Sequence, residues 1–145
     1  MKGGIVSYQN VSPTEAKELL EGDAGAVYID VRSIPEYEGG HPAGAFNIPI
    51  MQRHAAGMVP NLDFVEVVQA HFAADAKLLV GCQSGARSMR ACEALVAAGF
   101  TDVANVTAGF GGSRTERGWQ ALGFPVEFGA SDDKGYAALS GDSGA

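Results

Sequence analysis

The fold of this chain is decided at residues 78–88, which read Leu78-Leu79-Val80-Gly81-Cys82-Gln83-Ser84-Gly85-Ala86-Arg87-Ser88. The apolar residues that open this stretch predict a buried strand, and a helix is predicted from about Arg87, where apolar residues begin to recur at helical spacing. Cys82 therefore stands where the carboxyl end of a strand meets the amino end of a helix. Open α/β sheets bind their ligands at such junctions, and unpaired helix amides bind anions there.

The loop after Cys82 has the features that a reactive cysteine needs. A thiol reacts as the thiolate, which is favoured by helix N–H groups, a nearby guanidinium and some exposure to solvent. Arg87 supplies the guanidinium, and Gly85 permits a positive φ, so that successive N–H groups converge on the sulfur. The predicted active loop comprises Gln83, Ser84, Gly85, Ala86, Arg87 and Ser88. If Cys82 were only a small buried hydrophobic residue, there would be no reason to expect Gly85, Arg87 and Ser88 at these positions after it.

The second cysteine, Cys92, is predicted to pack. It shares the apolar face of the predicted helix with Leu95 and Val96. Two cysteines ten positions apart, one in a loop and one in a helix, do not have the spacing of zinc ligands. We expect no metal site, no disulfide and no cofactor.

Composition limits the class of protein without naming its activity. A chain of 145 residues is long enough for one domain with a proper core. The formal charge of −7 argues against nucleic acid and anionic membranes as partners, because both require a basic patch. The start of the chain shows no apolar secretory segment and no transit-peptide composition. Together with two unpaired cysteines, this predicts a reducing cytoplasm.

Apolar and polar periods alternate along the chain as strand, helix, strand, helix. This order predicts an α/β fold with a central, mostly parallel, five-stranded sheet and helices on both faces. The five predicted strands are residues 5–8, 26–31, 45–48, 77–81 and 103–106. We expect the domain to cover residues 1–128. Residues 129–145 are rich in Gly, Ser, Asp and Ala, which predicts a mobile tail in which Tyr136 and Leu139 dock locally.

Helix starts are indicated by a serine followed three residues later by glutamate, the capping-box pattern. This pattern occurs at residues 12–15, 33–36 and 113–116. A further helix is predicted over residues 62–72, with its apolar stripe toward the core. Trp119 is predicted to lie in the helix that begins at Ser113.

Several separated motifs in this chain, spread over residues 5–128, resemble those of the single-domain rhodaneses, the thiosulfate sulfurtransferase-like proteins. The motifs are Asp30-Val31-Arg32, Glu36-Tyr37, Gly40-His41-Pro42-Ala43-Gly44-Ala45, Asn47-Ile48-Pro49, the Cys82–Ser88 loop, and Gly111-Gly112 with Trp119. Two departures are small. Pro42-Ala43 stands where an aliphatic residue and then proline are more usual, and Ala86 occupies a position that is often basic. The second departure leaves Arg87 as the only cation of the loop, which bears on substrate preference.

The resemblance implies a sulfurtransferase that works through a persulfide on Cys82. Sulfane sulfur would pass from a small donor such as thiosulfate to cyanide, a thiol or a protein acceptor. Arg87 would hold an anionic donor, or else form a salt bridge with a strand-end acid such as Asp30. Ser84 and Ser88 would donate hydrogen bonds to the sulfur, and the alternative for Ser88 is a helix cap. Asp30 and Arg32 end a strand at the same sheet edge, where they orient the active loop or only fix a turn.

Two other classes of function remain open from the sequence. A rhodanese-fold binding or regulatory module is one, although such modules usually lack the cysteine. A cysteine phosphatase or arsenate reductase is the other. Four residues separate Cys82 from Arg87, one fewer than in those enzymes, and the smaller ring of amides suits a single sulfur atom better than a phosphate. Those phosphatases also carry histidine where this chain has Gly81.

Overall fold

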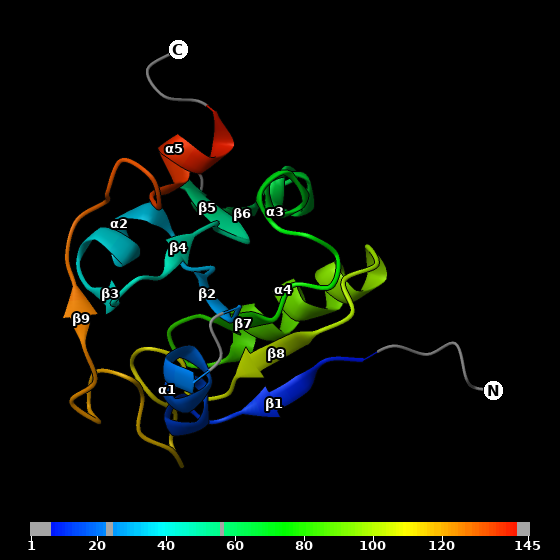
Figure 1. Ribbon diagram of the computed structural model, residues 1–145. Helices are drawn as coiled ribbons and strands as arrows, with labels where there is room; N and C mark the ends of the chain where they lie inside the picture. The colour runs from blue at the N-terminus through cyan, green and yellow to red at the C-terminus, as the bar shows by residue number, and fades with distance from the viewer. Residues whose placement is uncertain (1–6, 23–24, 56, 142–145) are drawn as a thin grey trace.

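The computed structural model describes residues 7–22, 25–55 and 57–141 (Figure 1). Its centre is a five-stranded sheet in the order β1-β8-β7-β2-β4, and all neighbouring strands in it pair parallel. These strands are β1 (Gln9–Val11), β2 (Val27–Asp30), β4 (Phe46–Asn47), β7 (Leu78–Gly81) and β8 (Val103–Val106). The predicted α/β fold with five parallel strands is confirmed.

Helices cover both faces of this sheet (Figure 1). They are α1 (Pro13–Gly22), α2 (Ile34–Glu38), α3 (Phe64–His71), α4 (Ala86–Ala97) and α5 (Tyr136–Ser140). Two small antiparallel pairs lie outside the sheet. β3 (His41–Pro42) pairs with β9 (Val126–Glu127), and β5 (Met51–His54) pairs with β6 (Gly57–Pro60) in a hairpin. The helix predicted over residues 62–72 is α3.

Strand β7 shows how the two halves of the core are built. Successive side chains of a strand point to opposite faces of a sheet. Leu78 and Val80 therefore join a core with α3, α4 and α5, whereas Leu79 joins the opposite core with α1 and Trp119. All three side chains are fully buried. Burial on both faces fixes the register of the strand that carries Cys82.

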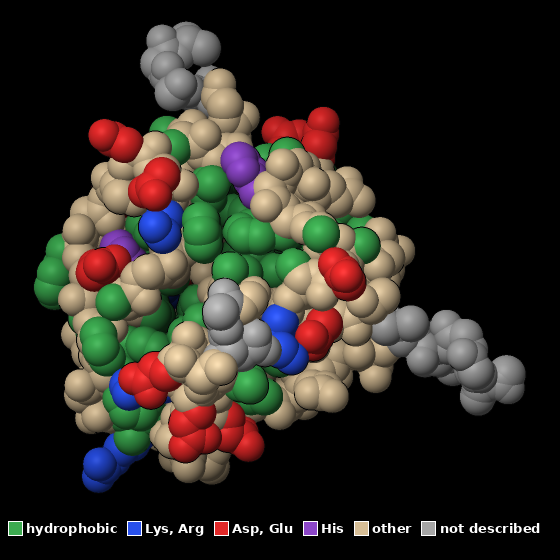
Figure 2. All heavy atoms as spheres, viewed as in Figure 1, with side chains coloured by type: hydrophobic (Ala, Val, Ile, Leu, Met, Phe, Trp, Pro, Cys, Tyr) green, Lys and Arg blue, Asp and Glu red, His purple; other side chains and the backbone are tan. Residues whose placement is uncertain are grey.

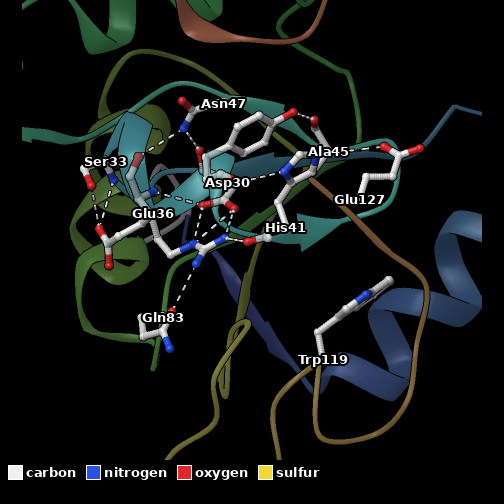
Figure 3. A network of polar contacts seen from close by, with 12 residues as sticks. Asp30, Ser33, Glu36, His41, Ala45, Asn47, Gln83, Trp119 and Glu127 are labelled. Atoms are coloured by element: carbon white, nitrogen blue, oxygen red, sulfur yellow. Dashed lines mark hydrogen bonds and ion pairs between the residues drawn. The ribbon is translucent and has the colours of Figure 1, made fainter. Parts of the chain in front are cut away.

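Two of the three predicted capping boxes are present. At α1 the Ser12 amide donates to Glu15 Oε1 at 2.8 Å, and the Glu15 amide donates to Ser12 Oγ at 3.0 Å. At α2 the amide and hydroxyl of Ser33 both donate to Glu36 Oε1, at 3.1 and 2.9 Å (Figure 3). These bonds satisfy amide groups that would otherwise be unpaired in the first turn.

The helix predicted to start at Ser113 is absent, and Trp119 lies in a series of turns. Two contacts explain the error. The Glu116 carboxylate accepts a hydrogen bond from Thr107 Oγ1 at 2.6 Å instead of capping Ser113, whose amide donates to the Glu116 carbonyl at 2.8 Å. Gly118 is packed so closely against Gly112 that a Cβ atom at Gly118 would collide with the Gly112 backbone. Tertiary contacts thus override a local helix signal.

The first strand also differs from its prediction. The described strand is Gln9–Val11, and Ser7 and Tyr8 precede it. Residues 5 and 6 of the predicted strand lie outside the described residues. Asn10 pairs in register with Asn105 of β8, and Asn105 Nδ2 donates to Asn10 Oδ1 at 3.1 Å. This edge strand is mostly polar and exposed and is paired with β8. The apolar pattern used to predict strands therefore did not identify it.

Residues after Phe128 contact the rest of the chain. Tyr136 and Leu139 are buried in the α3–α4 side of the core. The Tyr136 hydroxyl accepts a hydrogen bond from Asn61 Nδ2 at 3.0 Å, and His71 Nε2 lies 2.6 Å from the Leu139 carbonyl oxygen. The predicted docking of these two side chains is thus seen, and the division of the chain at residue 128 stays a prediction.

The surface agrees with the acidic composition. Asp and Glu side chains are spread over the face shown in Figure 2, with few Lys and Arg side chains among them. In the part of the chain that the structure describes, every helix is too short or too polar to cross a membrane.

Candidate active site

Cys82 lies directly after β7, at the carboxyl edge of the sheet, and is almost completely buried. The residue before it must be glycine. A Cβ atom at Gly81 would collide with the hydroxyl group of Tyr28, which packs against the Gly81 backbone. Burial raises the pKa of Tyr28 well above its ordinary value, so this hydroxyl stays neutral. Tyr28 thereby fixes the approach of β7 to the cysteine.

The loop turns back over the sulfur at Gly85, which has φ of +110° and is the N-cap of α4. Its amide donates a hydrogen bond to Cys82 Sγ at 3.1 Å. A side chain here would meet the Thr107 carbonyl oxygen as well as strain the backbone. The positive φ predicted for Gly85 is therefore present, and it aims an N–H group at the sulfur.

A second loop, which contains Gly109, Phe110 and Gly111, packs against the backbone of the active loop. The Phe110 amide donates to the Cys82 carbonyl, and the Gly111 amide donates to the Gln83 carbonyl, each at 2.8 Å. At Gly109 a Cβ atom would collide with the Cys82 carbonyl oxygen, and at Gly111 with the Gln83 side chain. The two loops thus approach as closely as glycine alone permits. The backbone carbonyl groups of Cys82 and Gln83 are therefore held in place by hydrogen bonds from the second loop.

Ser88 reaches the sulfur from the first turn of α4. Its Oγ lies 3.4 Å from Cys82 Sγ and accepts a hydrogen bond from the thiol. The Ser88 hydroxyl also contacts Asn105 Oδ1 and lies 3.1 Å from the Gly85 carbonyl oxygen. Since Gly85 is the N-cap, Ser88 does not cap the helix. It contacts the sulfur as an acceptor, and the donation to sulfur suggested by the sequence stays a prediction.

Asn105 is a site residue that sequence reasoning missed. It is buried in β8, where it accepts from Ser88 and donates to Asn10. The signal available in the sequence was a single amide inside the apolar run 103–106. A buried polar side chain needs hydrogen-bond partners, and here those partners lead to the cysteine.

Asp30 and Arg32 form a buried ion pair beside the loop (Figure 3). Arg32 Nε lies 3.0 Å from Asp30 Oδ1, and Arg32 Nη2 lies 2.8 Å from Asp30 Oδ2. The same guanidinium donates to the Gly40 carbonyl at 2.6 Å and to Gln83 Oε1 at 3.1 Å, and it lies over the Phe110 ring. Arg32 therefore reaches the active loop through a side chain, and Asp30 acts through Arg32.

Arg87 pairs with Glu36 rather than with Asp30, the partner that the sequence suggested. Its Nη1 and Nη2 atoms donate to Glu36 Oε1 and Oε2 at 2.7 and 2.9 Å. These bonds lower the pKa of Glu36 from 4.5 to about 2 and raise the pKa of Arg87. Asp30 is unavailable to Arg87 because Arg32 already occupies both of its oxygens.

Two surface pockets adjoin the active loop. One has a volume of about 580 Å³ and is lined by Ser33, Pro35, Glu36, Met51, Met58 and Arg87. The other, of about 520 Å³, is lined by Ser84 and residues 112–115. Ser84 thus faces this second pocket, and among the described contacts it makes no hydrogen bond to the sulfur. Gln83 and Ala86 are exposed.

Cys92 lies in α4 as predicted and is fully buried in the core. Burial raises the pKa of its thiol to about 12. The thiol is therefore protonated and inert at neutral pH. Neither cysteine is in a disulfide.

The fold and this loop define the class of protein. Residues 12–115 match the rhodanese-like domain, and the chain belongs to the rhodanese-like family, a family of sulfurtransferases. It is 42% identical over 118 residues to thiosulfate sulfurtransferase 16, chloroplastic, of Arabidopsis thaliana, covering 81% of this chain and 92% of that protein. It is 40% identical over 95 residues to rhodanese-like domain-containing protein 15, chloroplastic, of the same plant, covering 66% of this chain and 51% of that one.

A solved structure has the same fold. The crystal structure of Rv0390 from M. tuberculosis superimposes with a TM-score of 0.72 at 26% identity, over 85% of this chain and 99% of that one. The resemblance that the motifs predicted is confirmed.

The predicted cytoplasmic location is wrong. Both Arabidopsis relatives are chloroplastic proteins by name, which contradicts that expectation. Its basis was the composition at the start of the given sequence together with the pair of free cysteines, and free thiols indicate only a reducing compartment. A reducing compartment need not be the cytoplasm, so the cysteines did not determine the location.

Proposed function

We propose that this protein transfers sulfane sulfur through a persulfide on Cys82. In the first step the Cys82 thiolate attacks the outer sulfur of thiosulfate. A new S–S bond forms at Cys82, the S–S bond of the donor breaks, and sulfite leaves with its electron pair. In the second step a nucleophilic acceptor attacks the outer sulfur of the persulfide, and the thiolate is regenerated.

The observation that carries this proposal is the Gly85 amide at 3.1 Å from Cys82 Sγ, at the amino end of a twelve-residue helix. An N–H group and a helix N-terminus both stabilise negative charge. The thiolate and the persulfide are each anions at this position. The same groups therefore serve the resting enzyme and the intermediate, and the mechanism requires no side-chain base, metal or cofactor.

The surrounding residues act on the loop in distinct ways. Ser88, whose hydroxyl donates to Asn105, lies beside the sulfur, and this hydroxyl would have to turn away from Asn105 to donate to the thiolate. Arg32, held by Asp30, positions Gln83. The acceptor in this scheme is cyanide or a thiol, and the thiol is carried by a small molecule or by another protein.

Phosphatase or arsenate-reductase chemistry fits the site less well. Histidine before the cysteine, as expected for those phosphatases, has no room at residue 81 because Tyr28 fills that space. The loop is closed by the contact from Gly85 to the sulfur. Among the described contacts, that of Gly85 is the one loop amide on the sulfur, whereas a tetrahedral oxyanion would need several donors.

Mass spectrometry of the intact protein tests the proposal. Thiosulfate alone should add one sulfur atom, located by peptide mapping to Cys82, and cyanide should then remove it as thiocyanate. Cys82→Ser should lose both steps while keeping its circular dichroism spectrum. Cys92→Ser is the matched control and should keep both. Turnover by Cys82→Ser, or sulfur on Cys92, would contradict the mechanism.

A further inference from the structure

The only cation of the active loop is neutralised by Glu36. Both terminal nitrogens of Arg87 donate to the two carboxylate oxygens, and the pair is only partly exposed, with 23% and 36% of the two side chains accessible. Bidentate geometry of this kind is the most directional that arginine forms with a carboxylate. An anion approaching Arg87 therefore meets a carboxylate in the same plane.

The pocket that contains this pair is mostly apolar. Apart from Glu36 and Arg87, its described lining consists of Ser33, Pro35, Met51 and Met58. Its volume of about 580 Å³ lies within the range of about 300–1,000 Å³ that small organic ligands occupy. Thiosulfate is a far smaller ion and makes no use of methionine walls. Methionine side chains adapt to irregular apolar groups.

We propose that Glu36 is a specificity-determining residue for the sulfur donor. Its carboxylate repels doubly charged anions, and the pocket therefore favours donors with one negative charge and an apolar body, such as organic thiosulfonates. This inference rests on the sulfur transfer proposed above. The step itself is unchanged, because Cys82 attacks the outer sulfur of R–SO₂–S⁻, the donor S–S bond breaks, and the sulfinate R–SO₂⁻ leaves with the electron pair.

Glu36→Gln isolates the charge from the structural role of this residue. Glutamine at this position still accepts hydrogen bonds from Ser33, because a capping box takes either residue. The variant therefore keeps the start of α2, and it removes the negative charge together with one of the two acceptors of the Arg87 guanidinium. Glu66→Gln is the matched control, since Glu66 is an exposed residue of α3 that lines a different pocket.

Three donors with the same reacting group separate charge from shape. They are thiosulfate with two negative charges, methanethiosulfonate with one, and benzenethiosulfonate with one charge and a large apolar body. Coulomb energy is proportional to the charge of the donor. If Glu36→Gln raises kcat/KM for thiosulfate by about tenfold, it should raise kcat/KM for either thiosulfonate by only about threefold. The control variant should change none of these values.

The outcomes are distinct. The proposal is supported if the gain in Glu36→Gln is larger for thiosulfate than for the thiosulfonates and shrinks at high salt, as a charge effect must. It is overturned if all three donors gain or lose equally, which is the result of a purely structural role. If the wild-type enzyme takes sulfur from none of the three onto Cys82, sulfur transfer itself is contradicted, and the role of Glu36 is contradicted with it.

Discussion

Two arginine–carboxylate pairs flank the active loop, and they differ in almost every physical respect. Asp30 and Arg32 are two residues apart and buried, with side-chain exposures of 1% and 3%. Glu36 and Arg87 are 51 residues apart and partly exposed. The first pair makes further bonds to Gly40 and Gln83, whereas the second lines a surface pocket.

The difference indicates which pair supports the fold and which pair is accessible to a ligand. A buried charge without its partner is strongly destabilising, so Asp30 and Arg32 must act as one unit. A partly exposed pair contributes little to stability. Glu36 and Arg87 are therefore free to interact with a ligand, and the consequences of changing them should appear in activity rather than in folding.

The largest expected effect is on the buried pair. Arg32→Ala leaves the Asp30 carboxylate buried without its counter-ion and frees Gly40 and Gln83. We expect a loss of about 3–5 kcal/mol in the free energy of unfolding, measured by urea denaturation. Lys17→Ala is the control, because it removes an exposed ion pair with Glu21. An equally small effect in both variants would mean that Asp30 and Arg32 do not support the fold.

The exposed pair should behave in the opposite way. Arg87→Ala should change the free energy of unfolding by less than about 1 kcal/mol, because the side chains are partly solvated in either state. Urea denaturation again measures the change, beside thiosulfate turnover of the same preparation. A loss as large as that of Arg32→Ala would remove the distinction between the two pairs.

The smallest effect is the pH dependence of the exposed pair. The pKa of Glu36 is lowered to about 2 by its bonds to Arg87 and Ser33, so its contribution is fully present above its ordinary pKa of 4.5. That contribution is lost as the pH falls from 4.5 toward about 2. The stability difference between wild type and Glu36→Gln should therefore be constant at neutral pH and shrink in acid. A stability difference that stays constant down to pH 2 would show that Glu36 does not have the lowered pKa.

The same contrast separates the site residues that sequence could find from those that it could not. The cysteine, Gly85 and Arg87 lie within one short loop, where spacing and backbone chemistry are local properties. Asn105 and Glu36 reach the loop from a distant strand and helix. No local pattern states which acid meets Arg87, and the sequence suggested the wrong one. The bonds of Asp30 to Arg32 excluded it.

The elements of the fold also differ in whether local sequence or tertiary contacts decide them. Strands that are buried on both faces and consist mostly of apolar residues, such as Leu78–Gly81 and Val103–Val106, were predictable because such burial favours apolar side chains. The helix expected at Ser113 failed, although its capping pattern matches the two that succeeded. Glu116 had a better partner in Thr107, and the close contact of Gly112 with Gly118 requires turns instead.

By itself the sequence determined the parallel α/β architecture, the family and the position of the cysteine that we propose to be reactive. Hydrophobic periodicity and glycine conformation act over a few residues, so they can be read from the order of the side chains. The tertiary structure alone decided which carboxylate faces Arg87, which amide holds Ser88 and why residue 81 is glycine. Each of these depends on side chains brought together from distant parts of the chain, where packing and competition for hydrogen bonds choose the partner.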